Sequence, residues 1–167
     1  GWRNRKAFFH KLPPREQANN LLDKICEMGR YGQKTGAGFY KYDENRNPSP
    51  DPVIEELIVK HSQERGIKRR TISDQEILER ALYSMVNEGA KILEEGIAAR
   101  PIDIDIVWIY GYGFPVYRGG PMFWADQVGL STIYQAILKY RDQFGPEYWE
   151  PAPLLERLAK EGKGFYG

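Results

Sequence analysis

One stretch in the middle of the chain, residues 73–96, constrains the fold more than any other. Ser73 is followed three residues later by Glu76, which is the spacing of a capping box at a helix N-terminus. Small or apolar residues then recur at steps of three and four, at Leu78, Leu82, Met85, Gly89, Ile92 and Gly96. Such spacing places them on one face of a helix, and Gly96 suits a left-handed stop. The sequence therefore predicts a long amphipathic helix that buries one face.

The next segment, residues 101–106, reads Pro-Ile-Asp-Ile-Asp-Ile and allows two interpretations. Its three isoleucines alternate with two aspartates, which is typical of a strand. Pro101, however, suits a first helical turn, and Asp103 and Asp105 favour the positive end of a helix dipole. Periodicity alone leaves both interpretations open.

Glycine and proline divide the rest of the chain into turns and helices. Turns with special dihedrals are expected at Gly111, Gly113, Pro115, Gly119 and Gly120. Helices are predicted after Pro14 up to Gly29, over about residues 52–65 up to Gly66, from Pro121 to Gly129, from a Ser131 cap to Phe144, and from Pro153 onwards. The pattern predicts a chain built mainly of helices.

Composition excludes several classes of function. The formal net charge of +1 provides no electrostatic footprint for nucleic acid or for an anionic membrane. No apolar run approaches the ~20 residues of a membrane span, and no signal peptide is visible. Cys26 is the one cysteine, which precludes an intramolecular disulfide and favours a reducing compartment. His10, His61 and Cys26 are too widely spaced to suggest a zinc site.

The glycine-rich segment 29–42, GRYGQKTGAGFYKY, has the composition of a phosphate-binding loop but not its order. A Walker loop ends in Gly-Lys-Ser/Thr, whereas here Lys34-Thr35 precedes Gly36. A dinucleotide fingerprint needs a strand before it and a helix after it, whereas here a helix is predicted before it. The segment is interpreted as a structural turn held by Phe39.

Three other segments are interpreted structurally. Phe8 and Phe9 are expected to anchor the N-terminal segment to a core. Residues 43–52, DENRNPSPDP, are expected to form a polar, proline-rich linker. The basic run at residues 68–70 is expected to be a solvated turn.

The ending of the chain repeats an earlier motif, Gly-x-Gly-Phe-Tyr, at residues 36–40 and 162–166. Each copy follows a predicted helix that opens with Leu-Leu, which suggests a duplication. The second copy has a long front part, residues 73–130, for which the first copy has no counterpart. The chain is thus interpreted as the back half of one repeat plus a linker, residues 1–52, followed by a linking helix and one complete repeat, residues 53–167.

Two segments carry a resemblance to a known family. NEGAKILEEGIAARPIDIDIVWIYGYGFPVYRGGPMFWADQVGL at 87–130 and GRYGQKTGAGFYKYDENRNPSPDP at 29–52 resemble the C-terminal part of multifunctional fatty-acid β-oxidation enzymes. These enzymes fuse an enoyl-CoA hydratase/isomerase to an NAD-dependent 3-hydroxyacyl-CoA dehydrogenase. The resemblance implies two related all-α domains, and therefore a short helix at residues 101–106.

The resemblance also bears on catalysis. In the family a Rossmann domain that precedes both repeats holds NAD, and a His held by a Glu acts as general base. His10 and His61 do not match that His and are assigned no role. The family also has an Asn-Arg pair, with its active-site Asn, eight residues before an Asn-Glu pair. In this chain Asn87-Glu88 matches the Asn-Glu pair, and the Asn-Arg pair would fall on Glu79-Arg80. The Arg is therefore kept, whereas the Asn is replaced by Glu79. The second repeat thus resembles a copy that keeps the fold and has lost the site, with Asn87 as a packing or capping residue.

No catalytic, cofactor-binding or metal-binding residue is therefore assigned in this chain. The carboxylate pairs Asp103/Asp105 and Glu94/Glu95 are interpreted as a helix N-terminus and a solvated face. Four residues on the glycine-rich turn are candidates for an interdomain contact: Tyr112, Phe114, Pro115 and Arg118.

The chain is expected to be an inactive, packing fragment of a parent enzyme that oxidises 3-hydroxyacyl-CoA with NAD and hydrates 2-enoyl-CoA. Its expected partners are the Rossmann and hydratase domains of that parent, with acyl-CoA as the parent's substrate and no nucleic acid or membrane. A dimer contact is expected across residues 1–42. Bacterial cytoplasm is the expected location, with the peroxisome as the alternative. The alternative function is a free-standing helical interaction module that holds a peptide through Trp108, Tyr110, Tyr112, Phe123 and Trp124.

Overall fold

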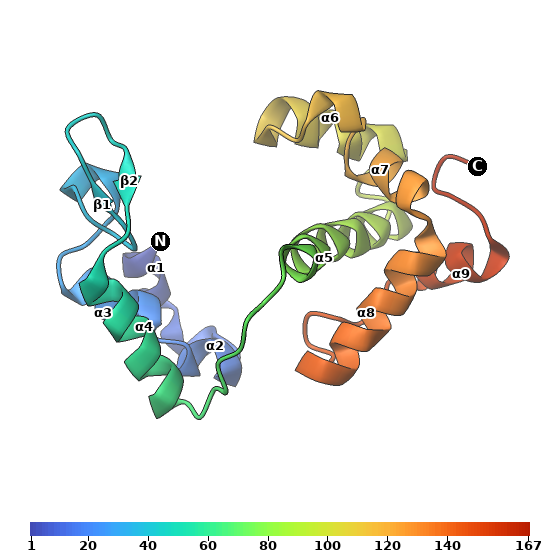
Figure 1. Cartoon of the computed structure of the whole chain (residues 1–167). Coiled ribbons are helices and arrows are strands. Elements are labelled where there is room, and N and C mark those ends of the chain that lie inside the picture. The colour runs from blue at the N-terminus through green and yellow to red at the C-terminus, as the bar shows by residue number, and fades with distance from the viewer. The chain divides into compact units, whose positions relative to one another are not determined.

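The computed structural model describes residues 1–167, apart from the side chain of Arg15. The chain forms two compact units, Gly1–Arg70 and Thr71–Gly167, which are described separately below (Figure 1). Helices dominate both units, and strand is confined among the described residues to one short hairpin. The predicted all-α class is confirmed.

The first unit is built from short elements. They are α1 (Trp2–Ala7), η1 (Phe9–Lys11), α2 (Pro14–Ala18), α3 (Leu21–Glu27), η2 (Gln33–Thr35), β1 (Lys41–Tyr42), β2 (Pro48–Ser49) and α4 (Pro52–Glu64). The single helix expected between Pro14 and Gly29 is wrong, because α2 and α3 are separated at Asn19-Asn20. Asparagine side chains compete for backbone hydrogen bonds and favour helix ends over helix interiors.

The anchoring role expected for Phe8 and Phe9 is also wrong in this unit. Both side chains are exposed, whereas the buried apolar side chains of the unit are Ile25, Cys26 and Ile54. The physical reason is that α1 is short and packs on α3 without presenting these two rings to it. The unit consequently leaves large apolar side chains in contact with solvent.

The segment expected to be a linker is instead a closed hairpin. β1 pairs antiparallel with β2, and the Asp43 carboxylate accepts the backbone N–H of Asn47 at 2.8 Å and its side-chain amide at 2.9 Å. Asp51, at the end of this segment, is buried and caps α4 by accepting the N–H of Val53 at 3.2 Å. The polar residues of this segment therefore combine solvent exposure with hydrogen bonds inside the hairpin.

Helix α4 belongs to the first unit. It packs against α3, so the compact unit extends to Arg70 instead of ending at residue 52. Residues 67–73, with the basic run 68–70, contain no helix or strand. The interpretation of the chain as a half repeat followed by a complete one stays a prediction.

The second unit contains α5 (Asp74–Glu94), α6 (Pro101–Tyr112), η3 (Val116–Arg118), α7 (Pro121–Val128), α8 (Leu130–Phe144) and α9 (Pro153–Glu161). The Ser73 hydroxyl accepts the N–H of Glu76 at 3.2 Å, which confirms the predicted cap of α5. Gly96, just past its end, has a φ of +71°, as predicted. Residues 101–106 are helical, because Pro101 occupies the first turn and Ile104 and Asp105 face the interior.

Two details of this unit differ from the predictions. Gly111 lies within α6 and does not form a turn, whereas Gly113, Gly119 and Gly120 all have positive φ. Ser131 lies inside α8, and the residue at the N-cap position is Gly129 with a φ of +93°. The positive φ of Gly129 lets α8 begin directly after α7 ends, so no separate serine cap is formed.

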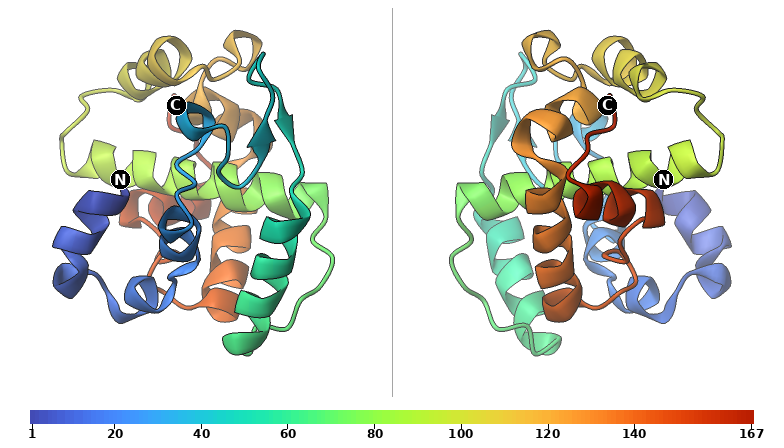
Figure 2. Two further views of the ribbon diagram at one scale, coloured as in Figure 1. Left: turned by 90° about the vertical axis from the view of Figure 1, so that its left-hand side faces the viewer. Right: turned by 90° about the vertical axis from the view of Figure 1, so that its right-hand side faces the viewer.

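The core of the second unit lies among α5, α7, α8 and α9. Figure 2 shows α5 crossing α8, with α9 alongside α8. The buried core residues are Tyr83, Val86, Ala90, Ala125, Leu130, Ile133, Ile137, Tyr140, Trp149, Ala152 and Leu155. Gly89 lets Met122 approach α5, since a Cβ at Gly89 would lie 2.5 Å from the Met122 sulfur. This unit therefore has a buried apolar core formed from its own helices.

Candidate interdomain site

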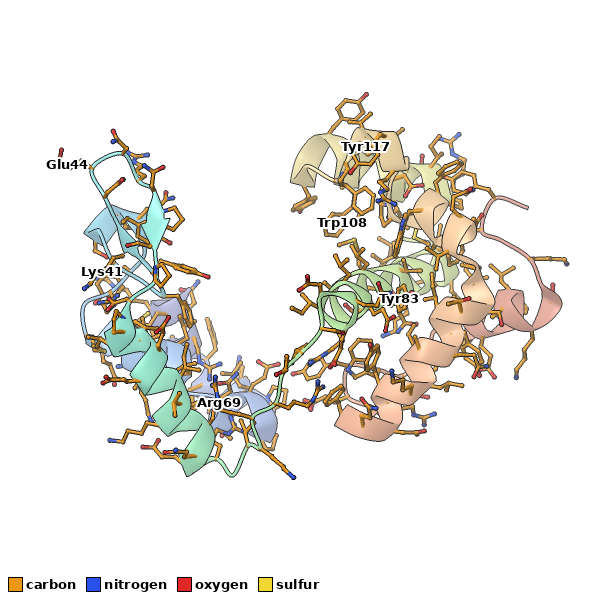
Figure 3. The ribbon with its side chains drawn as sticks, viewed as in Figure 1. Lys41, Glu44, Arg69, Tyr83, Trp108 and Tyr117 are labelled. Atoms are coloured by element: carbon orange, nitrogen blue, oxygen red, sulfur yellow. The ribbon has the colours of Figure 1, made fainter. Side chains whose placement is uncertain are left out.

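A cleft of about 500 Å³ opens on the second unit between α5 and the connection from α6 to α7. Its walls are aromatic, with rings contributed by Tyr83 of α5, Trp108 and Tyr112 of α6, Phe114 and Tyr117 of the turn, and Trp124 of α7. Figure 3 labels Tyr83 on α5, with Trp108 of α6 and Tyr117 of η3 above it. The cleft belongs wholly to residues 75–124.

The structure brings together the four residues proposed from the sequence. Tyr112, Phe114, Pro115 and Arg118 all line the cleft. Gly113, with a φ of +75°, ends α6 and allows the N–H of Phe114 to bond the carbonyl of Trp108 at 2.9 Å. The turn is thereby folded back against its own helix. The role of these residues in a contact stays a prediction.

The far end of the turn is fixed by Asp105, whose role sequence reasoning missed. This carboxylate is 1% exposed and accepts the N–H groups of Met122 at 2.7 Å and Phe123 at 3.0 Å. It therefore caps α7 from the neighbouring helix, because the first N–H groups of a helix have no partner within it. A Cβ on Gly120, whose φ is +98°, would clash with Asp105, so glycine is required there.

Asp105 and Asp103 thus have different roles, although the sequence suggested one role for the pair. Asp103 pairs with Arg100 at 2.8 Å, and the hydrogen bond from that guanidinium lowers the pKa of Asp103. Asp105 instead accepts the hydroxyl of Tyr166 at 2.6 Å, and burial raises the pKa of Tyr166. In the sequence, Asp105 and Pro121 are well separated. That separation does not reveal that the Asp105 carboxylate and the start of α7 meet in space.

The aromatic side chains on the rim of the cleft are unusually exposed to solvent. Tyr117 is 84% exposed and Tyr112 is 73% exposed, and Val116 between them is exposed as well. Tyr110 also faces solvent, but it does not line the cleft. Soluble proteins rarely expose large contiguous apolar patches, and such patches commonly mark interaction sites.

The alternative set of aromatic residues is not gathered on one surface. Trp108, Tyr112 and Trp124 line the cleft, whereas Phe123 packs edge-on against Tyr166 with ring centroids 5.9 Å apart. Phe123 thus participates in the packing of the C-terminal segment. A peptide site using all five rings is not supported by this arrangement.

Glu79 also lines the cleft and is its acidic group. Its two oxygens accept the Tyr140 hydroxyl at 2.5 Å and the Gln75 amide at 2.9 Å. These hydrogen bonds, that from Tyr140 foremost, lower the pKa of Glu79. The carboxylate is therefore ionised at neutral pH. Burial in turn raises the pKa of Tyr140.

The neighbouring residues of the degenerate family motif serve packing. Arg80 places its guanidinium 4.4 Å from the centroid of the Phe144 ring. Asn87 is buried, donates to the carbonyl of Glu150 at 2.8 Å and accepts the N–H of Ala152 at 2.8 Å. Asn87 thus holds the segment that leads into α9, in agreement with its predicted packing or capping role.

Residues 29–42 do not have the geometry of a nucleotide cradle. They form η2 and lead into the hairpin, and Gly32 and Gly36 adopt positive φ, so the predicted structural turn is confirmed. Phe39 is exposed and does not hold the turn. Arg30 holds it instead, by donating to the carbonyl of Gly38 at 2.9 Å.

The described part of the chain offers few candidate groups for metal binding or for histidine chemistry. Its His, Cys, Asp and Glu residues form no cluster of three or more that could hold a metal ion. His10 is exposed, and His61 is buried on α4 with neither ring nitrogen hydrogen-bonded to a described residue. Among the described helices, none combines the length and apolar character that crossing a membrane requires.

Comparison with known proteins identifies the class to which this helical chain belongs. Residues 77–165 match the family described as 3-hydroxyacyl-CoA dehydrogenase, C-terminal domain. The match covers more than half of the chain, so the chain belongs to this family. The predicted resemblance is confirmed.

The relatives are longer, multifunctional proteins. The peroxisomal bifunctional enzyme of Danio rerio is 42% identical over 97% of this chain, and the glyoxysomal fatty acid beta-oxidation multifunctional protein MFP-a of Brassica napus is 36% identical over 93% of it. The chain spans only 24% and 22% of these two proteins. The dehydrogenase part of multifunctional enzyme 1 from C. elegans is a similar solved structure, with a TM-score of 0.64 and 27% identity over 91% of this chain and 34% of that one.

Proposed function

We propose that this chain is the C-terminal helical part of a fatty-acid β-oxidation enzyme that oxidises 3-hydroxyacyl-CoA with NAD and hydrates 2-enoyl-CoA. The observation that carries the proposal is the match of nearly the whole chain to about a quarter of a bifunctional enzyme. NAD and acyl-CoA bind elsewhere in the parent, on its Rossmann and hydratase domains. The peroxisomal or glyoxysomal names of the relatives favour a peroxisome over bacterial cytoplasm.

Within the parent, the second unit packs against other domains through the rim of the cleft. Tyr112, Phe114, Pro115 and Arg118 provide the contact. The support is physical: Tyr112 is largely exposed, and aromatic and arginine side chains dominate the energetics of protein interfaces. The unit's own core is complete without these residues, so their exposure is available for a partner.

A second contact, with another copy of the chain, lies on the first unit across residues 1–42. Apolar or aromatic side chains exposed in this range are Phe8, Phe9, Leu22, Met28, Tyr31, Phe39 and Tyr40. An apolar surface of this extent favours association in water. Analytical ultracentrifugation of the chain and of Phe8→Ser/Phe9→Ser tests it, with a monomer at all concentrations as the contradicting result.

Hydrogen exchange tests the domain contact directly. Amides of residues 112–118 should exchange at least about tenfold more slowly in the full-length enzyme than in this 167-residue chain, because a docked domain suppresses local opening. Amides on the exposed side of α8 provide the control and should be unaffected. Equal exchange at residues 112–118 in both proteins contradicts the contact.

An NAD titration of the same chain tests the assignment of the cofactor to the rest of the parent. Calorimetry should detect no binding at micromolar NAD, because residues 29–42 form a turn and not a nucleotide cradle. The full-length enzyme serves as the positive control. Micromolar binding to the chain alone would sink the proposal that it is a packing part.

A further inference from the structure

The aromatic cleft contains a carboxylate, Glu79, that is held by hydrogen bonds from uncharged groups, with Lys139 of α8 contributing only a weaker attraction through its charge. Glu79 lines the cleft together with Tyr83, Trp108 and Trp124. Its hydrogen-bond donors among the described residues, Gln75 and Tyr140, are both uncharged. The cleft therefore combines an ionised acid with several aromatic faces.

Both features select for positive charge. The face of an aromatic ring is electronegative and attracts a cation placed within about 6 Å of its centroid. A carboxylate beside such rings acts in the same direction, and the apolar walls reduce screening of its charge by water. An anionic or purely apolar guest would displace water from the Glu79 carboxylate without bringing a cation to its charge, which is costly.

The arginine residues near the cleft do not fulfil this role. Arg118 is exposed on the rim and places its guanidinium 5.5 Å from the centroid of the Tyr117 ring. Arg80 lies against Phe144 and pairs with Glu76 at 3.6 Å. Guanidinium groups thus lie close to aromatic rings in this unit. Arg118 also lines the cleft, and Lys139 acts on Glu79 through its charge, but neither forms an ion pair with Glu79 among the described residues.

We propose that the cleft receives an arginine side chain from a segment of the parent enzyme outside these 167 residues, paired with Glu79 and stacked on Trp108. This inference rests on the proposed function and specifies the chemistry of the docked partner. Arginine is favoured over lysine because its planar guanidinium both stacks on rings and forms a two-pronged pair with a carboxylate.

The size of the cleft indicates that the guest is a segment and not a free ion. A volume of about 500 Å³ is far more than one guanidinium fills. The apolar side chains of Leu78 and Leu82 on α5 line the remainder. Residues flanking the arginine in the guest segment are therefore apolar. About three quarters of the length of the bifunctional relative lies outside this chain and can supply such a segment.

The first experiment titrates the ¹⁵N-labelled chain with N-acetyl-arginine methylamide and, separately, with the uncharged citrulline analogue. The indole N–H resonances of Trp108 and Trp124 should shift in a saturable way at millimolar arginine amide, with citrulline binding at least about tenfold more weakly. Trp149, which is buried in the core, is the internal control and should not shift. Equal binding of the two probes, or no saturable shift with arginine, overturns the proposal.

Three variants test which side chains bind the arginine. Glu79→Gln keeps an acceptor for the Tyr140 hydroxyl but should weaken arginine binding by about tenfold or more. Glu95→Gln removes the same charge at the exposed far end of α5 and should leave binding unchanged. Trp108→Leu, which removes the stacking face, should weaken binding independently of the contact between Glu79 and Tyr140. Unchanged binding in Glu79→Gln overturns the proposal.

Hydrogen exchange in the full-length enzyme separates this inference from the proposed function. Slow exchange at residues 112–118 in the wild type that becomes faster in Glu79→Gln supports both. Slow exchange that is identical in wild type and Glu79→Gln supports the domain contact and overturns the arginine. Fast exchange at residues 112–118 in the wild type contradicts the domain contact itself and therefore both.

Discussion

The same five-residue motif is held in place differently in the two units. At residues 36–40, Arg30 donates to the carbonyl of Gly38 and pairs with the buried Asp51 at 2.5 Å. At residues 162–166, no cation is used: the carboxylate of Asp126 accepts the N–H of Phe165 at 2.7 Å and that of Tyr166 at 3.0 Å. The first copy therefore depends on an ion pair and the second on uncharged donors.

Each copy is nevertheless tied to a buried aspartate that caps a helix. Asp51 caps α4 through Val53. Burial opposes its ionisation most strongly, but the hydrogen bonds from Arg30 and Val53 and the charges of Arg30 and Lys41 together outweigh burial, so the pKa of Asp51 is lowered. Asp105 caps α7 and receives the Tyr166 hydroxyl. The comparison teaches that a repeated motif can conserve its position next to a helix cap while the chemistry that secures it differs.

The largest expected effect is that of Asp105→Ala. Two backbone N–H groups and the Tyr166 hydroxyl lose their acceptor, which should lower the free energy of unfolding by about 3 kcal/mol. Urea unfolding followed by tryptophan fluorescence measures it. Asp103→Ala is the matched control and should change little, because its partner Arg100 is exposed. Equal effects of the two substitutions would contradict the distinction between them.

Arg30→Met tests the ion pair of the first copy. Removing the guanidinium leaves the buried Asp51 with only Lys41 as a charge partner, at 3.6 Å and on a largely exposed side chain. Local opening of the glycine-rich turn should therefore become at least roughly tenfold more frequent. The backbone amides of Gly32 and Tyr42, which are hydrogen-bonded within the turn, report this by hydrogen exchange. Lys34→Met removes an exposed cation from the same turn and should leave their exchange unchanged. Unchanged exchange in Arg30→Met would show that the ion pair does not hold the turn.

The second glycine of each motif should be sensitive to an added methyl group. A Cβ at Gly164 would clash with the Asp126 carboxylate, and a Cβ at Gly38 would lie 2.9 Å from the Gly32 Cα. Each Gly→Ala substitution should cost about 1–3 kcal/mol in the free energy of unfolding.

Gly111→Ala is the control for these two substitutions. Gly111 lies in α6 with open space around its Cα, so alanine there should be neutral or stabilising by up to ~1 kcal/mol. Thermal unfolding of the three variants measures the differences. Stable folding of Gly164→Ala with its Asp126 hydrogen bonds intact would refute the steric argument.

The smallest effect concerns pH and Glu79. Because its pKa is lower in the folded chain than the ordinary value of 4.5, its contribution to stability is fully present above 4.5 and is lost as the pH falls through the folded pKa. Glu79→Gln should therefore flatten the decline of stability between neutral and acidic pH. Unfolding midpoints of both proteins across that range measure the difference, and parallel pH curves would contradict it.

The two units also differ in what the sequence predicted well. Helix limits in the second unit were predicted closely, because Ser73, Pro101, Pro121 and Pro153 act within one turn of the residues they affect. In the first unit, the Asn19-Asn20 break and the hairpin at residues 41–49 were missed. Short elements provide too few residues for a periodic pattern, so hydrogen bonds that form only after folding decide their limits.

The candidate site was predicted in part. The glycine-rich turn with Tyr112, Phe114, Pro115 and Arg118 was selected from the sequence, and the structure places all four at one cleft. Glu79 was identified only as a departure from the family motif, and its position beside the aromatic rings of α6 and α7 was not anticipated. The charge of Glu79 can act on a guest in the cleft only because Glu79 and the distant residues Trp108 and Trp124 line the same cavity.

The sequence by itself determined the helical class, the family and the ends of the long helices, because these depend on local spacing and on short-range backbone chemistry. Only the tertiary structure decided the partners of the buried polar groups: Asp105 with α7 and Tyr166, Arg30 with Asp51, and Asn87 with the segment before α9. The physical reason is that a hydrogen bond forms within about 3 Å in space. Residues 17 to 65 positions apart reach that distance only when the elements that carry them have packed.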